Sequence, residues 1–306
     1  MRILVSGATG LIGSATCKLL AARGDQVVAL SRDSGRANAQ LGAGVEVHEW
    51  RSPTSEPPPP TALEGTDAVI HLVGEPIGQR WTSKAKREVR ASRLLSTRLL
   101  VSSLATLAEK DRPGTLVCQS AVGYYGPRGD EEIGEDAPPG NDFLAGLVAD
   151  WEHEAEAARQ YARVVCTRTG VVLSPRGGAL AKMLPPFRLG LGGPIAGGRQ
   201  YVPWVHLDDV AAALVFSATD GRVTGPVNLT APAAVTNREF SRALAKVLRR
   251  PALVPVPAVA LWVLYGQMSS IVVTGQRAVP ARLQEAGFQF RYNEVEPALR
   301  DVLSVP

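Results

Sequence analysis

The sequence predicts an α/β protein with a doubly wound parallel sheet and a smaller, discontinuous C-terminal domain. Short runs rich in valine, isoleucine and leucine recur through the first two-thirds of the chain, and helical patterns separate them. Most of these runs are apolar almost throughout, which is typical of parallel strands that are covered on both faces. The alternation of strands and helices predicts right-handed crossover connections, with helices on both sides of one sheet.

Six runs are expected to form the strands of this sheet. In chain order they are residues 2–7, 26–31, 45–50, 67–74, 115–120 and 163–173. The helical segment 14–24 follows the first run and ends on Gly24, a residue type that often ends a helix. The stretch 51–65 is rich in proline and is expected to be a surface connection, with a docking motif for a proline-binding partner as the alternative.

A change of composition near Ser174 indicates the second domain. Residues 174–200 are rich in glycine and proline and contain one short apolar helix. After a strand at 226–231, two more helical patterns occupy 237–250 and 258–266. We therefore expect residues 1–173 and 206–232 to form the first domain, and residues 174–205 and 233–306 to form the second.

The composition is that of an ordinary globular protein, with 45% hydrophobic and 20% charged residues among 306. The net charge of +4 is spread along the chain, which favours an anionic small molecule over nucleic acid as a partner. Cys17, Cys118 and Cys166 lie in apolar elements without a close pair, so we expect reduced thiols in a cytoplasmic protein. The chain opens directly on a strand, and prolines interrupt the apolar stretch 251–267, so no membrane segment is expected. A monomer and a homodimer both fit these observations.

A glycine-rich turn joins the first expected strand to the first expected helix. Gly7, Gly10 and Gly13 have the spacing G-x-x-G-x-x-G. Glycine permits a tight turn and a close approach of the backbone to a pyrophosphate, whose charge the amides at the helix start can bind. The strand before and the helix after the turn favour a dinucleotide site over a plain turn. The expected cofactor-binding residues here are Gly7, Ala8, Thr9, Gly10, Leu11, Ile12 and Gly13.

The residues after the second strand predict NADP(H) rather than NAD(H). A carboxylate at this position would accept hydrogen bonds from the ribose hydroxyls of NAD, but the sequence has Ser31 and Arg32. A guanidinium beside a hydroxyl can bind the 2′-phosphate of NADP through charge-assisted hydrogen bonds, whereas the simpler alternative is an ordinary surface arginine.

The fourth expected strand ends in residues that can lie against a ribose. Leu72, Val73, Gly74 and Glu75 follow His71 directly. We interpret His71 as a hydrogen-bonded core histidine rather than a ligand, and the four histidines of the chain have no metal-binding spacing. No metal site is therefore expected.

At several separated places the sequence resembles one protein superfamily. The strings are "GATGLIG", "HLVGEPIGQRWT", "SAVGYYG", "RTGVVLSPRGGALAKMLPPFRLGLGGPI", "GRQYVPWVHLDDV" and "GQRAVPARLQEAGFQF". They resemble the extended, atypical short-chain dehydrogenases/reductases, in the epimerase-like branch that is sometimes labelled after a cell-division inhibitor. The resemblance covers essentially the whole chain, and it implies a Rossmann domain that binds NADP(H) and a C-terminal substrate domain.

The resemblance also implies roles for residues outside the glycine-rich turn. Arg80 and Arg93 lie where this branch has arginines, and both are expected to bind the cofactor. For Arg93 the expected contact is with the cofactor phosphates or with an anionic substrate. Arg199 matches the position at which epimerases bind a substrate diphosphate, and Tyr201 and Trp204 either line the substrate pocket or serve as hydrophobic cover.

The catalytic motif of the superfamily is incomplete in this chain. Its members use a strand serine, and a tyrosine with a lysine four residues later on one helix face. Ser120 matches the serine, but Phe143 and Leu147 stand where the tyrosine and the lysine are expected. None of the six tyrosines has a lysine four residues on. Tyr124 and Tyr125, just after Ser120, are the remaining candidates for proton transfer. The alternatives are that they form a wall of the pocket or pack under the acidic loop 130–136.

These observations predict an NADP(H)-binding, epimerase-like oxidoreductase that acts on an anionic or sugar-like small molecule without the Tyr-x-x-x-Lys pair. A catalytically silent NADPH-binding protein with a regulatory or redox-sensing role is the main alternative. A third hypothesis is a membrane-surface or cell-division effector. It would need a broad apolar or basic face, and the sequence gives no sign of one.

Overall fold

A seven-stranded parallel sheet forms the centre of the protein, in the strand order β11-β7-β5-β4-β1-β2-β3. The computed structural model describes every residue except 253, 305 and 306. The order reverses between β4 and β1, which places a crevice at the carboxyl ends of these strands. The strands are β1 (Arg2–Ser6), β2 (Gln26–Ser31), β3 (Val45–Glu49), β4 (Ala68–His71), β5 (Thr115–Ala121), β7 (Arg163–Thr169) and β11 (Gly225–Leu229).

The six predicted strands are all present, with one difference in the last. The run 163–173 forms two strands, β7 in the main sheet and β8 (Val171–Leu173), which pairs with β10 (Trp204–His206) outside it. A Cβ atom on Gly170 would lie 2.0 Å from the carbonyl oxygen of Pro203, so only glycine allows the chain to leave the sheet here.

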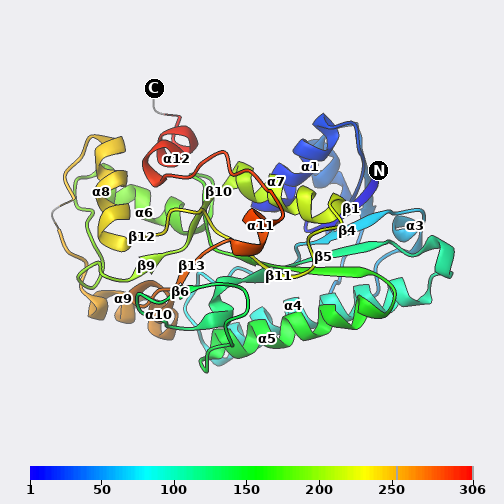
Figure 1. Cartoon of the computed structure of the whole chain (residues 1–306), viewed down its shortest axis with the longest axis horizontal. Helices are drawn as coiled ribbons and strands as arrows, with labels where there is room; N and C mark the ends of the chain where they lie inside the picture. Colours follow the sequence, from blue (N-terminus) through cyan, green and yellow to red (C-terminus); the bar gives the residue numbers. More distant parts are fainter. Residues whose placement is uncertain (253, 305–306) are drawn as a thin grey trace.

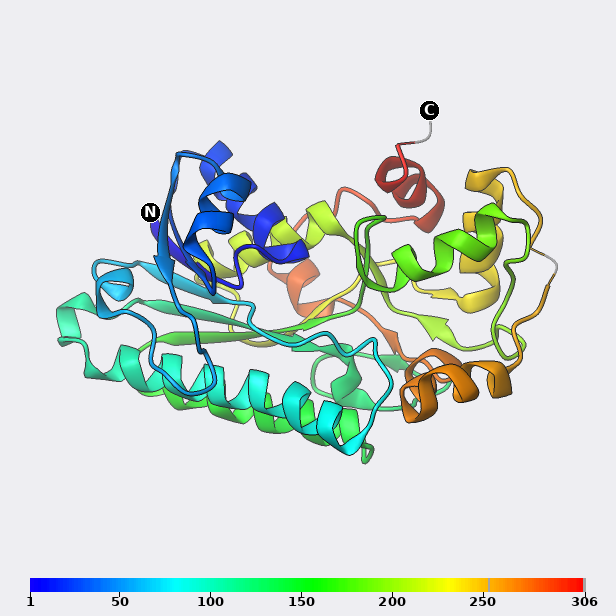
Figure 2. The same ribbon diagram turned by 180° about the vertical axis from the view of Figure 1, so that it is seen from behind.

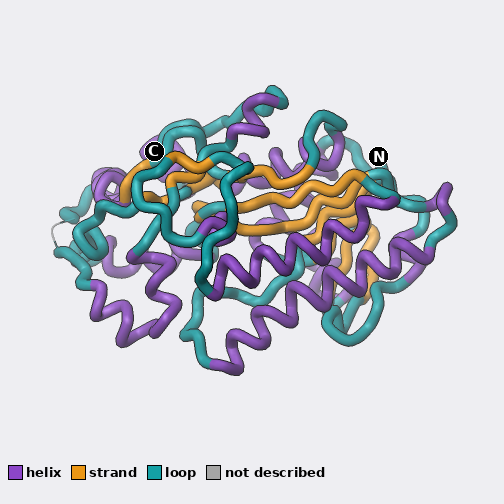
Figure 3. The backbone as a smooth tube through the Cα atoms, turned by 60° about the horizontal axis from the view of Figure 1, so that its bottom comes forward, coloured by secondary structure: helices purple, strands orange, loops and turns teal. Residues whose placement is uncertain are grey.

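Helices cover both faces of the sheet (Figures 1 and 2). α1 (Leu11–Ala22) and α7 (Leu207–Thr219) lie on one face, over a core that includes Ile3, Val5 and Val117. The long helices α4 (Ser83–Thr106) and α5 (Phe143–Glu156) run side by side over the other face (Figure 3), around Leu4, Leu116 and Trp151. The predicted doubly wound α/β fold is confirmed. The shorter helices of this part are α2 (Ser34–Leu41) and α3 (Pro60–Leu63).

A second hydrophobic core lies beyond the carboxyl ends of the strands, at the left of Figure 1. It is built around the buried Trp204, Phe240 and Leu244. Thr236 begins α8 with a capping box in which Glu239 is the reciprocal partner. The helices around this core are α6 (Gly178–Arg188), α8 (Asn237–Leu248) and α12 (Val295–Val302), and the short strands β9 (Tyr201–Val202) and β12 (Val235–Thr236) pair beside them.

Part of the C-terminal segment, before α12, packs away from this second core. α11 (Ala281–Glu285) returns to the main sheet, where Leu283, Phe288 and Phe290 pack into the core around α7. Residues 281–290 were expected in the second domain, but their apolar side chains bury against the first. β13 (Arg277–Ala278), which precedes α11, pairs with β6 (Glu132–Ile133).

α9 (Ala258–Tyr265) is an apolar helix that buries none of its side chains. Val259, Trp262, Val263 and Leu264 are each about 60% exposed, with Trp262 at 61%. The helix continues through a 3-10 turn (Gly266–Ser269) into α10 (Ser270–Val273), next to the start of α4 (Figure 2). Within residues 1–252 and 254–304, no helix has both the length and the apolar character that crossing a membrane requires.

Candidate functional site

A cleft of about 730 Å³ opens at the carboxyl ends of the central strands. The glycine-rich turn forms one wall, and the segment Leu72–Glu75 after β4 forms another. Such a crevice at the point of strand-order reversal is where doubly wound proteins bind nucleotides. Beyond these walls the cleft is lined by Leu30, Ser31, Arg32, Arg36, Trp50, residues 51–55, Glu88, Ala91 and Ser92.

The glycine-rich turn has a geometry that side chains would block. Gly7 has a φ of +67°, and a Cβ atom there would lie 2.8 Å from the carbonyl oxygen of Leu72. A Cβ atom on Gly13 would lie 2.2 Å from the carbonyl oxygen of Gly7. α1 begins at Leu11 after Gly10, and no side chain caps its first amides. The turn therefore fits the phosphates of a dinucleotide, which bind to backbone amides at a helix start.

Three arginines surround the end of this cleft next to β2. The Arg32 side chain is 73% exposed and lies 3.4 Å from the carboxylate of Glu75. Ser31 is nearly buried, with its hydroxyl donating to the carbonyl of Asp33. Arg36 of α2 and Arg51 after β3 line the same cleft. The sequence predicted only Ser31 and Arg32, because the approach of Arg36 and Arg51 depends on how α2 and β3 pack.

The start of the proline-rich connection also belongs to the cleft. Residues 51–55 form part of its wall, and the indole of Trp50 donates to the carbonyl of Glu56 at 2.8 Å. The connection was predicted as a plain surface loop, and its composition gave no signal for this contact.

Arg93 supports the Leu72–Glu75 segment from behind. Its guanidinium donates to the carbonyl oxygens of Glu75 at 3.0 Å and Val89 at 3.1 Å, and it packs 5.1 Å from the ring of Trp151. Burial lowers the pKa of Arg93 to about 10. A Cβ atom on Gly74 would lie 3.1 Å from the guanidinium carbon, so a larger residue there would crowd Arg93.

His71 is a hydrogen-bonded core histidine, as predicted. It is fully buried, with the Ser6 hydroxyl 2.7 Å from Nδ1 and the Ser96 hydroxyl 3.3 Å from Nε2. Burial lowers its pKa to about 3, so the ring is neutral at physiological pH.

Ser120 belongs to a buried polar network. Its side chain is 2% exposed, and its hydroxyl donates to Oε1 of Glu152 on α5 at 2.5 Å. Arg168 on β7 donates to both oxygens of the same carboxylate, at 2.9 and 2.8 Å. The predicted catalytic serine is therefore hydrogen-bonded to the carboxylate of the Arg168–Glu152 ion pair.

Tyr125 lies at the other end of this network. It is fully buried, and its hydroxyl donates to Asn228 at 2.6 Å and accepts from Arg168 at 3.0 Å. Burial raises the pKa of Tyr125 to about 12. Glu135, also buried, accepts from the backbone of Asn228 at 2.9 Å, which fixes this part of the network. Ser120 and Tyr125, which the sequence suggested for catalysis, thus have structural partners and almost no exposed surface.

Tyr124 differs from its neighbours because it is only half-buried. The guanidinium of Arg168 stacks 3.5 Å above its ring, and the ring of Tyr125 packs against it edge-on. Among the three predicted catalytic residues, Tyr124 alone keeps a surface that a ligand can reach.

The start of α5 carries no catalytic pair. Asp142 caps the helix by accepting from the amide of Ala145 at 2.8 Å, so Phe143 is its first residue. Leu147, where the family lysine is expected, is 1% exposed and packs into the core under α5. Phe143 is half-buried and meets Trp81 edge-on, with ring centroids 5.1 Å apart.

The residues predicted for the substrate side are spread over different environments. Trp204 is 1% exposed, and its indole donates to the carbonyl of Ala233, so it is a core residue and cannot line a pocket. Tyr201 in β9 is half-buried beneath the guanidinium of Arg277, which lies 5.5 Å from its ring. Arg199 is exposed in the bend before β9.

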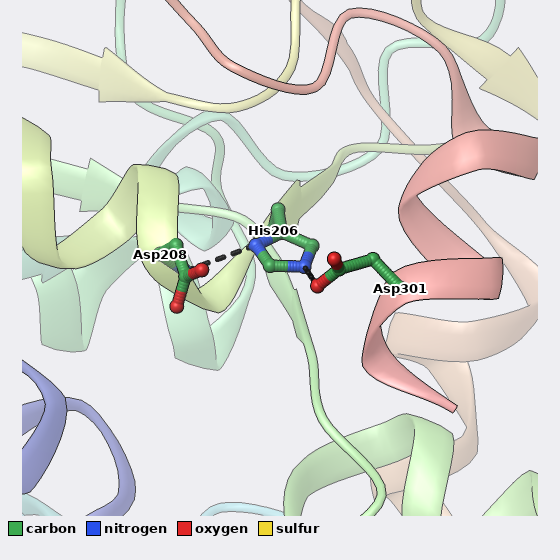
Figure 4. A group of neighbouring side chains, drawn as sticks. All are labelled: His206, Asp208 and Asp301. Carbon is green, nitrogen blue, oxygen red and sulfur yellow. Dashed lines mark hydrogen bonds and ion pairs between the residues drawn. The ribbon is translucent and has the colours of Figure 1, made fainter. Parts of the chain in front are cut away.

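His206, Asp208 and Asp301 gather at the start of α7 (Figure 4). His206 is the N-cap of this helix, because its Nδ1 accepts from the amide of Asp208 at 3.0 Å. Its Nε2 lies 3.1 Å from the carboxylate of Asp301. Both ring nitrogens are therefore in use, and we interpret the group as a helix cap rather than a metal site.

Two aspartates follow this cap along α7. Asp208 and Asp209 both lie in the first turn of α7, where a negative charge is favourable, but His206 is the cap. Asp209 is buried and accepts from the amides of Arg291 at 2.8 Å and Tyr292 at 3.0 Å. It thereby ties the C-terminal segment to α7.

Arg80, which was predicted to bind the cofactor, is not among the residues that line the cleft. Its guanidinium donates to the carbonyl oxygen of Val263 in α9 at 2.7 Å. The structure therefore places Arg80 towards the second core and the exposed helix α9, away from the arginines at the end of β2.

Comparison with known proteins identifies similar chains over the full length. Residues 3–229 match the model of the NAD dependent epimerase/dehydratase family, and residues 256–302 match a domain of unknown function, DUF1731. The mouse epimerase family protein SDR39U1 is 40% identical over 99% of this chain and 100% of its own. The Mycobacterium bovis epimerase family protein Mb2239 is 41% identical over 97% of this chain and 96% of its own.

Solved structures show the same arrangement. The crystal structure of human SDR39U1 (isoform 2) with NADPH is 36% identical, covers 99% of both chains and has a TM-score of 0.88. The UDP-glucose 4-epimerase of Thermus thermophilus in complex with NAD is 21% identical, with a TM-score of 0.76 over 99% of both chains, and shows the shared fold. The chain belongs to the NAD-dependent epimerase/dehydratase family.

Proposed function

We propose that this protein binds NADP(H) and acts as an epimerase-like oxidoreductase on an anionic or sugar-like small molecule. The observation that carries the cofactor choice is the group of Arg32, Arg36 and Arg51 around the end of β2. Guanidinium groups bind a phosphate through charge-assisted hydrogen bonds. The nearby carboxylate of Asp33 is used as the N-cap of α2, where it accepts from the amide of Arg36 at 2.9 Å. The human relative crystallised with NADPH supports the same choice.

The remainder of the cleft fits the rest of a dinucleotide. The glycine-rich turn would bind the pyrophosphate, and the segment Leu72–Glu75, fixed from behind by Arg93, would contact the ribose at the reactive end. When bound, NADP(H) would supply or accept a hydride. The protein residues then have to orient the substrate and move the matching proton.

Tyr124 is our candidate for this proton transfer. Ser120 and Tyr125 are buried in the network, and Phe143 and Leu147 have no titratable group. The Tyr124 ring is half-buried at the end of β5, beneath the positive charge of Arg168. The contact with Arg168 fixes the position of this ring, and a group that transfers a proton has to be held in place against the substrate.

We expect Tyr124→Phe to lower kcat by at least about 100-fold, because positioned acid–base groups contribute that much, while NADPH affinity stays unchanged. A screen of NADPH oxidation over ketoses, nucleotide sugars and small aldehydes would identify a substrate for this measurement. Tyr124→Ala, which also removes the ring beneath Arg168, separates the loss of the hydroxyl from the loss of packing. Full turnover in Tyr124→Phe would exclude the tyrosine from the reaction.

A catalytically silent NADPH-binding protein with a regulatory or redox-sensing role is the second candidate. It is favoured by one observation, that Ser120 and Tyr125 are hydrogen-bonded within a buried network and have almost no exposed surface. NADPH binding without any turnover across the substrate screen would support this candidate over the enzyme.

A further inference from the structure

Three cationic side chains meet around one short segment at the end of α9. Arg80 donates to the carbonyl of Val263 at 2.7 Å. The ammonium group of Lys86 on α4 donates to the side chain of Gln267 at 2.6 Å. Lys182 on α6 donates to the carbonyl of Gly78, and its ammonium group lies 5.4 Å from the ring of Tyr265. Residues 263–267 thus lie among three positive charges that come from three different elements.

The hydrogen-bond acceptors of Arg80, Lys86 and Lys182 are all uncharged carbonyl or amide oxygens. Throughout the described part of the chain, no carboxylate lies within ion-pair distance of Arg80, Lys86 or Lys182, whereas Lys84, on the same helix as Lys86, pairs with Glu88 at 3.8 Å. Like charges held close together repel one another, and hydrogen bonds to an anion are stronger than those to a carbonyl or amide oxygen. An anion would therefore be bound here in preference to the present acceptors.

The segment that now supplies these acceptors is held by few contacts. α9 buries none of its side chains, although it is apolar on all sides. A helix of this kind gains little from packing, so its position depends strongly on the polar contacts at its end. Arg80 and Lys86 can accordingly exchange Val263 and Gln267 for a ligand without disrupting a hydrophobic core.

The location of the group connects it to the cofactor cleft. Gly78 and Arg80 follow Leu72–Glu75, which forms the wall of that cleft. The ammonium group of Lys86 lies 4.6 Å from the ring centre of Phe143, the first residue of α5. This is the helix start at which the resemblance to the superfamily places the catalytic tyrosine.

We propose that Arg80, Lys86 and Lys182 form a binding site for the anionic group of the substrate, a carboxylate or a phosphate. The proposal rests on the proposed function, because it takes the ligand to be the substrate of an NADP(H)-dependent oxidoreductase. It differs from the position of Arg199, which lies in the bend before β9. The negative charge of the substrate then lies next to α9. When the ligand replaces the Val263 carbonyl and the Gln267 amide oxygen as hydrogen-bond acceptors, α9 moves.

The test uses the whole protein saturated with NADPH, so that the cofactor phosphates do not compete for the site. Inorganic phosphate and acetate, the two probes, are titrated by calorimetry at low ionic strength, since salt screens such contacts. Wild type should bind at least one of the two probes. Lys86→Gln and Lys182→Gln should each weaken the binding about tenfold or more, as expected for a lost charge-assisted hydrogen bond. Lys86→Arg, which keeps the charge, should restore most of it.

Lys84→Gln is the matched control, because Lys84 is only two residues away on the same helix but is 80% exposed and paired with Glu88. It should leave probe binding unchanged. Equal affinities in Lys84→Gln, Lys86→Gln and wild type, or no binding of either probe to wild type, would overturn the proposed site. NADPH affinity is measured in the same samples. If the wild-type protein does not bind NADPH, the proposed function itself is contradicted. If it binds NADPH but the lysine substitutions leave the affinity for the probes unchanged, only the anion site is contradicted.

Discussion

Arg168→Ala is expected to lower the free energy of unfolding by roughly 3–5 kcal/mol, because it leaves a buried carboxylate without its cation. The side chains of Arg168 and Glu152 are only 3% and 12% exposed, and two hydrogen bonds join them. The same substitution removes the donor that Tyr125 accepts from at 3.0 Å. Urea unfolding followed by circular dichroism would measure the loss.

An exposed ion pair that involves the same helix, α5, provides the control. Arg90 on α4 pairs with Asp150 on α5, and their side chains are 45% and 50% exposed. Arg90→Ala should cost less than about 1 kcal/mol, since solvent screens such pairs. Equal losses in the two variants would mean that the network around Ser120 does not stabilise the fold, and would reopen a catalytic role for that serine.

Gly13→Ala is expected to weaken NADPH binding by at least about 100-fold, which corresponds to roughly 2.7 kcal/mol. The added Cβ atom would lie 2.2 Å from the carbonyl oxygen of Gly7 and 2.8 Å from the Cα atom of Ala8, so the turn has to move. The amides that bind the pyrophosphate would move with it. Fluorescence titration with NADPH measures the affinity, and circular dichroism shows whether the sheet stays folded.

Gly146→Ala is the matched substitution in another helix. Gly146 lies within α5, and a Cβ atom there meets nothing within 4 Å. This variant should bind NADPH as wild type does and should be slightly more stable, since alanine is a better helix former than glycine by roughly 1 kcal/mol. If both glycine variants bind NADPH equally, the turn around Gly13 does not form the phosphate site.

The sheet could be predicted from the sequence because its signals are local. Most strands are short apolar runs, and β1, β2, β4, β5 and β7 are buried along most of their length. The edge strand β3 is only partly buried. The break at Gly170 was missed, because nothing in the run shows that the carbonyl of Pro203 approaches it. The return of Leu283 and Phe288 to the first core was missed for the same reason, since an apolar side chain can pack against either core.

The candidate site could be predicted only in part. The glycine spacing and Arg32 are visible in sequence, but Arg36 and Arg51 reach the cleft through tertiary packing. Ser120 is 32 residues from its acceptor Glu152, so a match to the family serine says nothing about its hydrogen bond. Trp204 was predicted for the substrate pocket as one alternative, and its burial shows the other, a core role.

The central claim, that this cleft is built for NADP(H), is tested most directly by titrating the wild-type protein with NADPH and NADH under identical conditions. The arginines at the end of β2 should give NADPH at least about a tenfold higher affinity, since each hydrogen bond to a charged group contributes roughly 1.5–3 kcal/mol. Arg32→Ala should reduce this preference and leave NADH affinity unchanged. Equal affinities for NADPH and NADH in the wild-type protein would contradict the assignment of the cleft to NADP(H).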